Sequence, residues 1–235
     1  MKTKFSNYII ALLFIILLLN ILPIPAFCME DEKTIYLTFD DGPAKKVTSD
    51  VLDILKKEDV PATFFLIGNQ IKGQDKILLR MKNEGHSIGL HSMSHKKANL
   101  YFSDEGFLKE MLDAQNIIKE ITGETSNILR FPFGCNNNSY CLKPGLVELL
   151  HENNLNIYDW NVDSTDGANY TASPSTYIKK SKSDENQIFL LMHCGYSNKN
   201  SVKALPDIIK FYKDKGYTFK EINDTTKELY HYKKK

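Results

Sequence analysis

The chain has few arginines, one tryptophan and almost no excess of charge of either sign. Its 235 residues include 30 lysines and arginines against 29 aspartates and glutamates, a formal net charge of +1. A chain without a strongly basic balance lacks the electrostatic attraction that nucleic acids require, so we expect no nucleic-acid partner. Nearly all the positive charge is lysine, because Arg80 and Arg130 are the only arginines. Each of these two arginines therefore needs a specific explanation.

Cysteine is also scarce, with four residues in the whole chain. Cys28 leaves with the N-terminal segment if that segment is cleaved. Cys135 and Cys141 flank an asparagine-rich loop, and outside the cell they would either form a disulfide or remain free thiols. Cys194 directly follows His193, and we expect it to be a small buried residue rather than a soft metal ligand.

Residues 1–28 have the pattern of a signal peptide. Lys2 and Lys4 precede a long apolar stretch, as in exported proteins. Residues 5–27 are also close to the roughly 20 residues that span a membrane, so the segment either is cleaved or stays as an anchor. Both alternatives predict an extracellular or cell-surface protein.

The remainder of the chain shows no internal repeat, no low-complexity linker and no second domain. We expect residues 29–225 to form one domain, because about two hundred residues suffice for a full core. Residues 226–235 are rich in lysine and are expected to form a frayed tail. We expect the protein to be a monomer.

Apolar runs with strand character alternate with helical patterns throughout this domain. The expected strands are 35–39, 62–67, 86–90, 127–131, 156–162, 187–193 and 217–221, and the expected helices are 48–58, 75–83, 103–122, 144–152, 174–180 and 202–213. This alternation predicts an α/β fold, a parallel sheet wrapped by helices that closes into a barrel. In such folds the chemistry collects at the C-terminal ends of the strands.

Two aspartates and two histidines predict a metal site at these strand ends. Asp40 and Asp41 directly follow the first apolar strand, and His91 and His95 are spaced so that one helical turn places them on the same side. Asp-Gly-Pro taken alone also fits a plain turn. One carboxylate with two imidazoles, however, forms a three-ligand site that leaves positions open for water and substrate.

The second carboxylate is then available as a base, which suits metal-assisted hydrolysis. Adjacent like charges raise one another's pKa unless a cation intervenes. A metal at Asp41 would resolve this repulsion, and Arg130 beside Asp40 would keep it ionised. The alternative for Arg130 is a surface salt bridge of little energetic consequence.

Other strand ends carry further candidates. Phe133 could line a sugar-binding groove and offer its backbone N–H to an oxyanion. His193 ends the apolar strand 187–193, and a histidine oriented there by a carboxylate makes a general acid. Asp166 is the candidate partner. Trp160 fits a strand interior and is expected to pack in the core.

Taken in order, these motifs resemble those of the polysaccharide deacetylases of carbohydrate esterase family 4. The resemblance covers residues 34–220 and rests on five blocks, which are Thr38–Pro43, His91–His95, Arg130–Phe133, Asp163–Gly167 and Leu191–His193. It implies a distorted (β/α) barrel and a metal-dependent N-deacetylase, usually with Zn²⁺, although Co²⁺, Ni²⁺ or Fe²⁺ would fit the same ligands.

Carried over residue by residue, the resemblance implies a role for each candidate. Asp41, His91 and His95 would hold the metal. Asp40 would be the base, with Arg130 orienting it. His193 would protonate the departing amine, with Asp166 tuning its pKa. Pro132 and Phe133 would contact the substrate, and the Phe133 N–H would help to hold the oxyanion.

The resemblance leaves the substrate open among acetylated glycans. We expect cell-wall peptidoglycan, with chitin-like oligomers, another acylated glycan or an inactive glycan-binding relative as alternatives. The chain departs from the family pattern at Gly167, where the family usually has tryptophan. That exchange removes an aromatic wall from the groove and affects substrate preference.

Overall fold

The structure is a computed structural model that describes residues 32–233. The predicted signal peptide or anchor, residues 1–28, lies outside the described residues. Within residues 32–233, none of the helices has the length and apolar character needed to cross a membrane.

One parallel sheet organises the domain. Its strands are β1 (Thr34–Gly42), β2 (Thr63–Leu66), β3 (Ser87–Leu90), β4 (Ile128–Leu129), β5 (Asn156–Ile157), β6 (Val162–Asp163), β7 (Gln187–His193) and β8 (Thr218–Phe219). They lie in the order β5-β4-β3-β2-β1-β7-β6, and β8 pairs with β1. All of these pairings are parallel, which confirms the predicted α/β fold with its sheet curved into a half-barrel.

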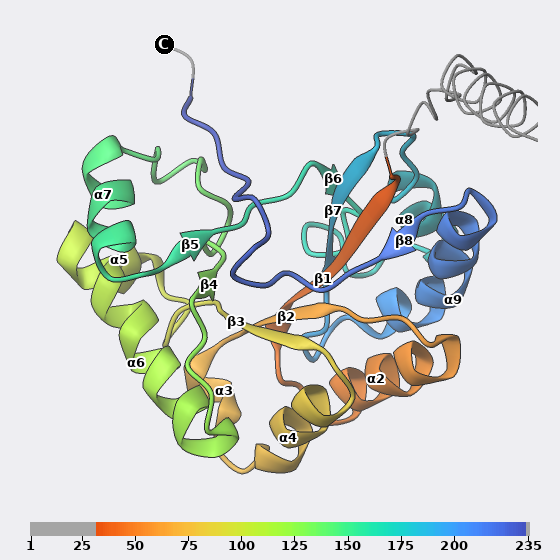
Figure 1. Cartoon of the computed structure of the whole chain (residues 1–235), viewed down its shortest axis with the longest axis horizontal. Helices are drawn as coiled ribbons and strands as arrows, with labels where there is room; N and C mark the ends of the chain where they lie inside the picture. The colour runs from red at the N-terminus through yellow and green to blue at the C-terminus, as the bar shows by residue number, and fades with distance from the viewer. Residues whose placement is uncertain (1–31, 234–235) are drawn as a thin grey trace, which may run out of the picture. The chain divides into compact units, whose positions relative to one another are not determined.

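Helices lie around the outside of the sheet (Figure 1). They are α2 (Lys46–Glu58), α3 (Gly68–Ile71), α4 (Asp75–Asn83), α5 (Lys97–Leu100), α6 (Asp104–Thr122), α7 (Pro144–Glu152), α8 (Pro174–Lys180) and α9 (Lys199–Asp214). The ends of α6 show why the sequence predicted it well. Ser103 Oγ accepts the Gly106 N–H at its start, and Gly123 at φ 76° ends it in the left-handed region.

The prediction of a single strand over 156–162 is wrong. The segment forms two short strands, β5 and β6, which lie at opposite ends of the sheet. Only residues 158–161 join them, and four residues reach at most about 3.3–3.6 Å each. The two edges of the sheet must therefore curve toward one another, which makes the barrel distorted and incompletely hydrogen-bonded.

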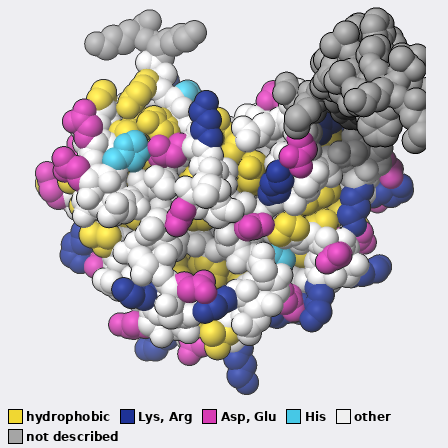
Figure 2. Space-filling model, in the orientation of Figure 1, with side chains coloured by type: hydrophobic (Ala, Val, Ile, Leu, Met, Phe, Trp, Pro, Cys, Tyr) yellow, Lys and Arg dark blue, Asp and Glu magenta, His cyan; other side chains and the backbone are white. Residues whose placement is uncertain are grey.

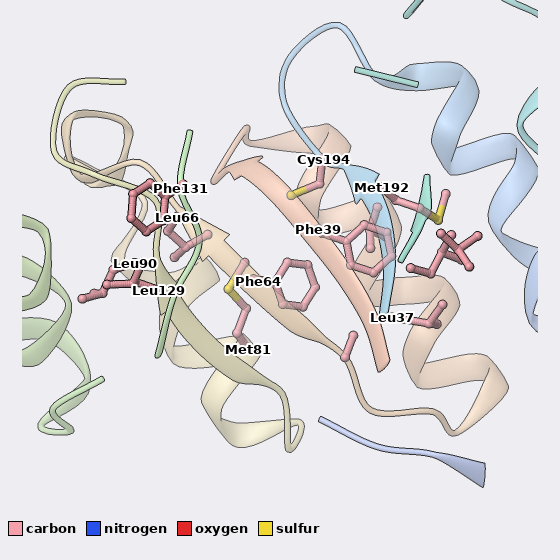
Figure 3. Packing of buried hydrophobic residues seen from close by; sticks show 14 of the residues in the cluster. Leu37, Phe39, Phe64, Leu66, Met81, Leu90, Leu129, Phe131, Met192 and Cys194 are labelled. Carbon is pink, nitrogen blue, oxygen red and sulfur yellow. The ribbon is translucent and has the colours of Figure 1, made fainter. Parts of the chain in front are cut away.

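The two faces of β1 have different partners because side chains alternate along a strand. Ile35, Leu37 and Phe39 belong to the large apolar cluster. Figure 3 shows part of this cluster, including Phe39 beside Phe64, whose ring centroids are 5.3 Å apart. Burying each such side chain stabilises the fold by about 1.5–3 kcal/mol.

The opposite face of β1 points into the half-barrel. Tyr36 lies there in a smaller apolar cluster, stacked on Phe189 with ring centroids 4.5 Å apart. Thr38 and Asp40 follow on the same face, so polar groups replace apolar ones toward the C-terminal end of the strand. This alternation delivers Asp40 to the rim, as the sequence predicted.

The expectation of a frayed C-terminal tail is wrong for much of that segment. Leu229 forms a parallel bridge with Tyr158, and its carbonyl accepts the Asp159 N–H at 2.6 Å. Glu228 accepts the Ile157 N–H at 2.6 Å. The segment therefore runs along the β5 edge, where its dark blue trace passes in Figure 1.

Charged side chains of both signs are interspersed over the face shown in Figure 2. This mixture agrees with the net charge of +1. Surface charges of mixed sign produce little long-range field, so this face offers no electrostatic reason to bind a polyanion.

Candidate metal and catalytic site

Asp41, His91 and His95 meet at the C-terminal rim of the sheet. Asp41 Oδ1 lies 3.5 Å from His91 Nε2 and 3.3 Å from His95 Nε2. Ligand atoms of the three residues all lie within 4.8 Å of one another. Asp41 Oδ1 is buried and has no hydrogen-bond partner among residues 32–233. A buried carboxylate oxygen that faces two imidazole nitrogens fits a divalent metal ion.

The histidines converge through a loop, not through the helical turn that the sequence analysis assumed. Residues 91–96 lie between β3 and α5, and Ser92 and His95 have left-handed φ values of 68° and 55°. The His95 N–H donates to Ser92 Oγ, and the Ser94 N–H donates to Glu110. These bonds hold the loop and bring the two imidazole centroids to 5.1 Å.

A backbone carbonyl on the far side of the ring from Asp41 sets the orientation of His91. Its Nδ1 lies 3.0 Å from the Arg130 carbonyl, so Nδ1 carries the proton and Nε2 turns toward Asp41. Burial lowers the pKa of His91 to about 3, the charge of His95 adds to this, and Asp41 opposes it. The ring is therefore neutral at physiological pH, as metal binding requires.

Asp40 lies deeper than Asp41 and is paired with Arg130. Arg130 Nη1 donates to Asp40 Oδ1 at 2.9 Å, and both side chains are buried. Asp40 Oδ2 lies 3.7 Å from His91 Nε2, so this carboxylate borders the candidate metal position. Burial raises the pKa of Asp40, and Arg130 opposes that rise without cancelling it. A raised pKa makes the carboxylate a stronger base.

Arg130 is fully buried, which rules out the surface salt bridge considered from sequence. Besides Asp40, its guanidinium donates to Thr38 Oγ1 at 2.6 Å and to the carbonyls of Tyr158 and Asp159 at 2.9 Å. The two carbonyls belong to the connection between β5 and β6. One side chain thus orients a site carboxylate and holds the edges of the half-barrel together.

His193 and Asp166 form the predicted pair. Asp166 Oδ1 lies 2.7 Å from His193 Nδ1, and Asp166 Oδ2 accepts the His193 N–H at 2.9 Å. Burial lowers the pKa of His193, but the hydrogen bond and charge of Asp166, with Asp40 and Asp41, raise it to about 9. The ring is therefore protonated at neutral pH and can donate a proton from Nε2.

The site opens into a pocket of about 320 Å³, and its lining includes all the candidates named above except Arg130, Pro132 and Asp166. Phe133 lines it, 44% exposed, with its ring centroid 4.6 Å from that of His95. No acceptor for the Phe133 N–H is found within residues 32–233. Pro132 is buried and does not line the pocket, and its carbonyl accepts a bond from Tyr101.

Sequence reasoning missed part of the lining. Trp160 was expected in the core, but it is half-buried and lines the pocket against Gly134. A neighbouring pocket of about 530 Å³ shares Asp41, His95 and His193 and adds Tyr170 and Tyr196. Both tyrosines lie in loops after strands, and exposed aromatic residues beside a C-terminal rim were the available signal.

None of the three cysteines within residues 32–233 forms a disulfide. Cys135 and Cys141 are free thiols, the first buried and the second exposed. Cys194 is buried, and it does not belong to the Asp41, His91 and His95 group.

Gly167 touches His193, and a side chain there is expected to impair the site. A Cβ built on Gly167 would lie 2.4 Å from His193 Cε1 and 2.6 Å from Nε2. Gly167→Ala should therefore displace the imidazole and lower kcat by about 10²-fold, with KM changed less. Steady-state kinetics on the variant test this.

Gly145→Ala is the matched control, because a Cβ at Gly145 meets nothing within 4 Å. It should retain wild-type kinetics. Equal kinetics for Gly167→Ala and wild type would show that the ring does not need its observed position.

The raised pKa of His193 predicts the alkaline limit of activity. If His193 is the general acid, as the sequence analysis predicts, it must be protonated, so kcat/KM should fall as the pH rises through about 9. Asp166→Asn removes the charge that raises this pKa, and the alkaline limb should move to lower pH by about 1–3 units. A pH–rate profile of both proteins measures the shift, and an unmoved limb would contradict the pairing.

The raised pKa of His193 also predicts how the stability of the fold depends on pH. It lies above the ordinary value of 6.5, so protonated His193 stabilises the fold. This contribution is complete below pH 6.5 and is lost as the pH rises through about 9.

A parallel half-barrel with these groups at its rim defines a candidate metal-dependent hydrolase, and comparison with known proteins agrees. The family described as polysaccharide deacetylase matches residues 29–144. A peptidoglycan-N-acetylglucosamine deacetylase of Bacillus cereus is 35% identical over 201 residues, covering 83% of this chain and 71% of that protein. A peptidoglycan-N-acetylmuramic acid deacetylase of Bacillus subtilis is 35% identical over 198 residues, covering 82% and 71%.

Solved structures show the same likeness. The crystal structure of a polysaccharide deacetylase from Bacillus cereus has a TM-score of 0.74 and 34% identity, covering 82% of this chain and 93% of that one. The chain therefore belongs to the polysaccharide deacetylase family and is a hydrolase of acetylated polysaccharide.

Proposed function

We propose that this protein removes N-acetyl groups from peptidoglycan in the cell wall, using one divalent metal ion, with Zn²⁺ as the native ion. One observation carries the mechanism. The Asp41, His91 and His95 group lies in one pocket with a buried base, Asp40, and a protonated acid, His193. We propose peptidoglycan as the substrate because the similar Bacillus proteins are peptidoglycan deacetylases.

Asp41, His91 and His95 hold the metal in this proposal. When bound, the metal supplies Lewis-acid activation of the acetyl carbonyl and of a water molecule. Asp40 takes the proton from the attacking water, and Arg130 keeps its carboxylate oriented. The Phe133 N–H is available to hold the developing oxyanion.

His193 completes the reaction as the general acid. Its Nε2 donates a proton to the departing sugar amine, because Nδ1 is bonded to Asp166. Asp40 and His193 therefore act at opposite ends of the scissile bond, one accepting and one donating a proton. Acetate and a free amine are the products.

The site's place at the cell surface is part of the same proposal. Residues 1–28 would direct export and either be removed or remain as an anchor, and the exposed aromatics Phe133, Tyr170 and Tyr196 would contact the glycan. Aromatic faces pack well against sugar rings because both are amphipathic.

The substrate is tested by offering the purified protein peptidoglycan, chitin oligomers and acetylated xylan, and by measuring acetate. We expect peptidoglycan to be preferred, and analysis of the released amino sugars identifies the deacetylated residue. Preference for chitin oligomers or xylan would overturn the peptidoglycan assignment while leaving the chemistry intact.

A further inference from the structure

A second group of metal-ligand side chains lies outside the catalytic set. Cys135 follows β4, Asp159 lies between β5 and β6, and His231 belongs to the C-terminal segment. One ligand atom from each lies within 4.8 Å of the other two. Cys135 and Asp159 are buried, and His231 is exposed. None of the three has a part in the deacetylation mechanism.

Asp159 is incompletely bonded in this group. Its Oδ2 accepts the Cys135 thiol at 2.8 Å and the Cys135 N–H at 3.3 Å. The residue is only 5% exposed, and its buried Oδ1 has no hydrogen-bond partner in the described part of the chain. A buried carboxylate that is half satisfied is unfavourable unless a cation completes it.

We propose that Cys135, Asp159 and His231 bind a second divalent metal ion of the zinc type. Thiolate, carboxylate and imidazole are all zinc ligands, and three of them with one water complete a tetrahedral site. Ligand atoms on one zinc ion lie roughly 3.3–3.5 Å apart by the usual bond lengths, so small side-chain adjustments suffice. Binding releases the Cys135 thiol proton to solvent.

The position of this site gives it a structural role. Cys135 lies two residues after Phe133, and Asp159 directly precedes Trp160, so both neighbours line the catalytic pocket. Asn136 already donates to the His231 carbonyl at 2.6 Å. A metal here would fasten the C-terminal segment to the pocket wall, and it would act by stabilising that wall.

Cobalt binding tests the proposal, because only a thiolate ligand gives sulfur-to-cobalt charge-transfer absorption in the near ultraviolet. The wild-type protein saturated with Co²⁺ should bind two ions per chain and show this band. His231→Ala, a change at an exposed residue, should bind one ion and lose or weaken the band. Cys135→Ser should abolish the band, and Cys141→Ser, the matched control, should keep both ions.

A separate variant distinguishes this site from the catalytic one. His91→Ala should lose the other cobalt ion and keep the band, and Zn²⁺ should still raise its melting temperature. One ion per chain without a band in the wild type would overturn the proposal. So would a band that survives Cys135→Ser and disappears in Cys194→Ser.

Discussion

Replacing Asp40 by asparagine is expected to lower kcat by about 10²–10⁴-fold, the usual contribution of a general base. Arg130 Nη1 donates to Asp40 Oδ1 at 2.9 Å, and asparagine keeps an oxygen that can accept this hydrogen bond. The fold should therefore survive, but with a melting temperature below that of the wild type, because the buried Arg130 loses the charge that compensates it. Asp41, His91 and His95 are untouched, so the variant should still bind metal there.

Asp163→Asn provides the comparison, because Asp163 lines the same pocket and caps the Thr165 N–H through Oδ1. Asparagine preserves that acceptor. Its kcat should exceed that of Asp40→Asn by at least roughly tenfold. If a folded, metal-loaded Asp40→Asn protein turned over like the wild type, Asp40 would not be the base.

Replacing Arg130 by alanine is expected to have the largest effect on stability. The change leaves the Asp40 carboxylate buried without its cation and removes bonds to the carbonyls of Tyr158 and Asp159. Breaking a buried pair in this way costs about 3–5 kcal/mol. Because small domains are stable by only about 5–15 kcal/mol, urea denaturation should show a large shift of the midpoint.

Arg80→Ala is the natural control, since Arg80 is the chain's other arginine. It pairs with Asp53 at 2.8 Å and Glu84 at 3.1 Å near the surface, with its side chain 28% exposed. Such pairs contribute about 0–1 kcal/mol. Similar losses for the two alanine variants would mean that Arg130 does not hold the half-barrel together.

Local sequence patterns predicted most elements because their signals are local. The structure places α4, α7 and α8 over the expected ranges, and β7 over Gln187–His193. Proline in the first turn of α7 and α8 and an uninterrupted apolar run in β7 are readable without knowing what they pack against.

Elements that depend on distant partners were not predictable. Residues 156–162 form one extended run in the sequence, and the break between β5 and β6 arises because the sheet curves and Arg130 bonds to the connection. The C-terminal segment has a lysine-rich composition typical of a tail. Its pairing with Tyr158 is made by the backbone of Leu229, and the partner residue lies far away in the sequence.

In the candidate site, too, the sequence motifs were predictable, whereas the conformations and contacts that depend on the fold were not. Asp40, Asp41, His91 and His95 were recognisable as a motif, and the structure brings them together. The assumed helical turn for the histidines was wrong, because Ser92 and His95 adopt left-handed backbone conformations that the spacing does not reveal. The contact between Gly167 and His193 also needs three-dimensional structure.

Acetate release from peptidoglycan, measured with and without a chelator, tests the central claim most directly. We predict release by the metal-loaded protein, its loss after chelation and its recovery on adding Zn²⁺ or Co²⁺, because we propose Asp41, His91 and His95 as the catalytic metal ligands. His95→Ala should remain inactive even with added metal. Full acetate release by the chelated, metal-free protein would contradict a metal-dependent deacetylase.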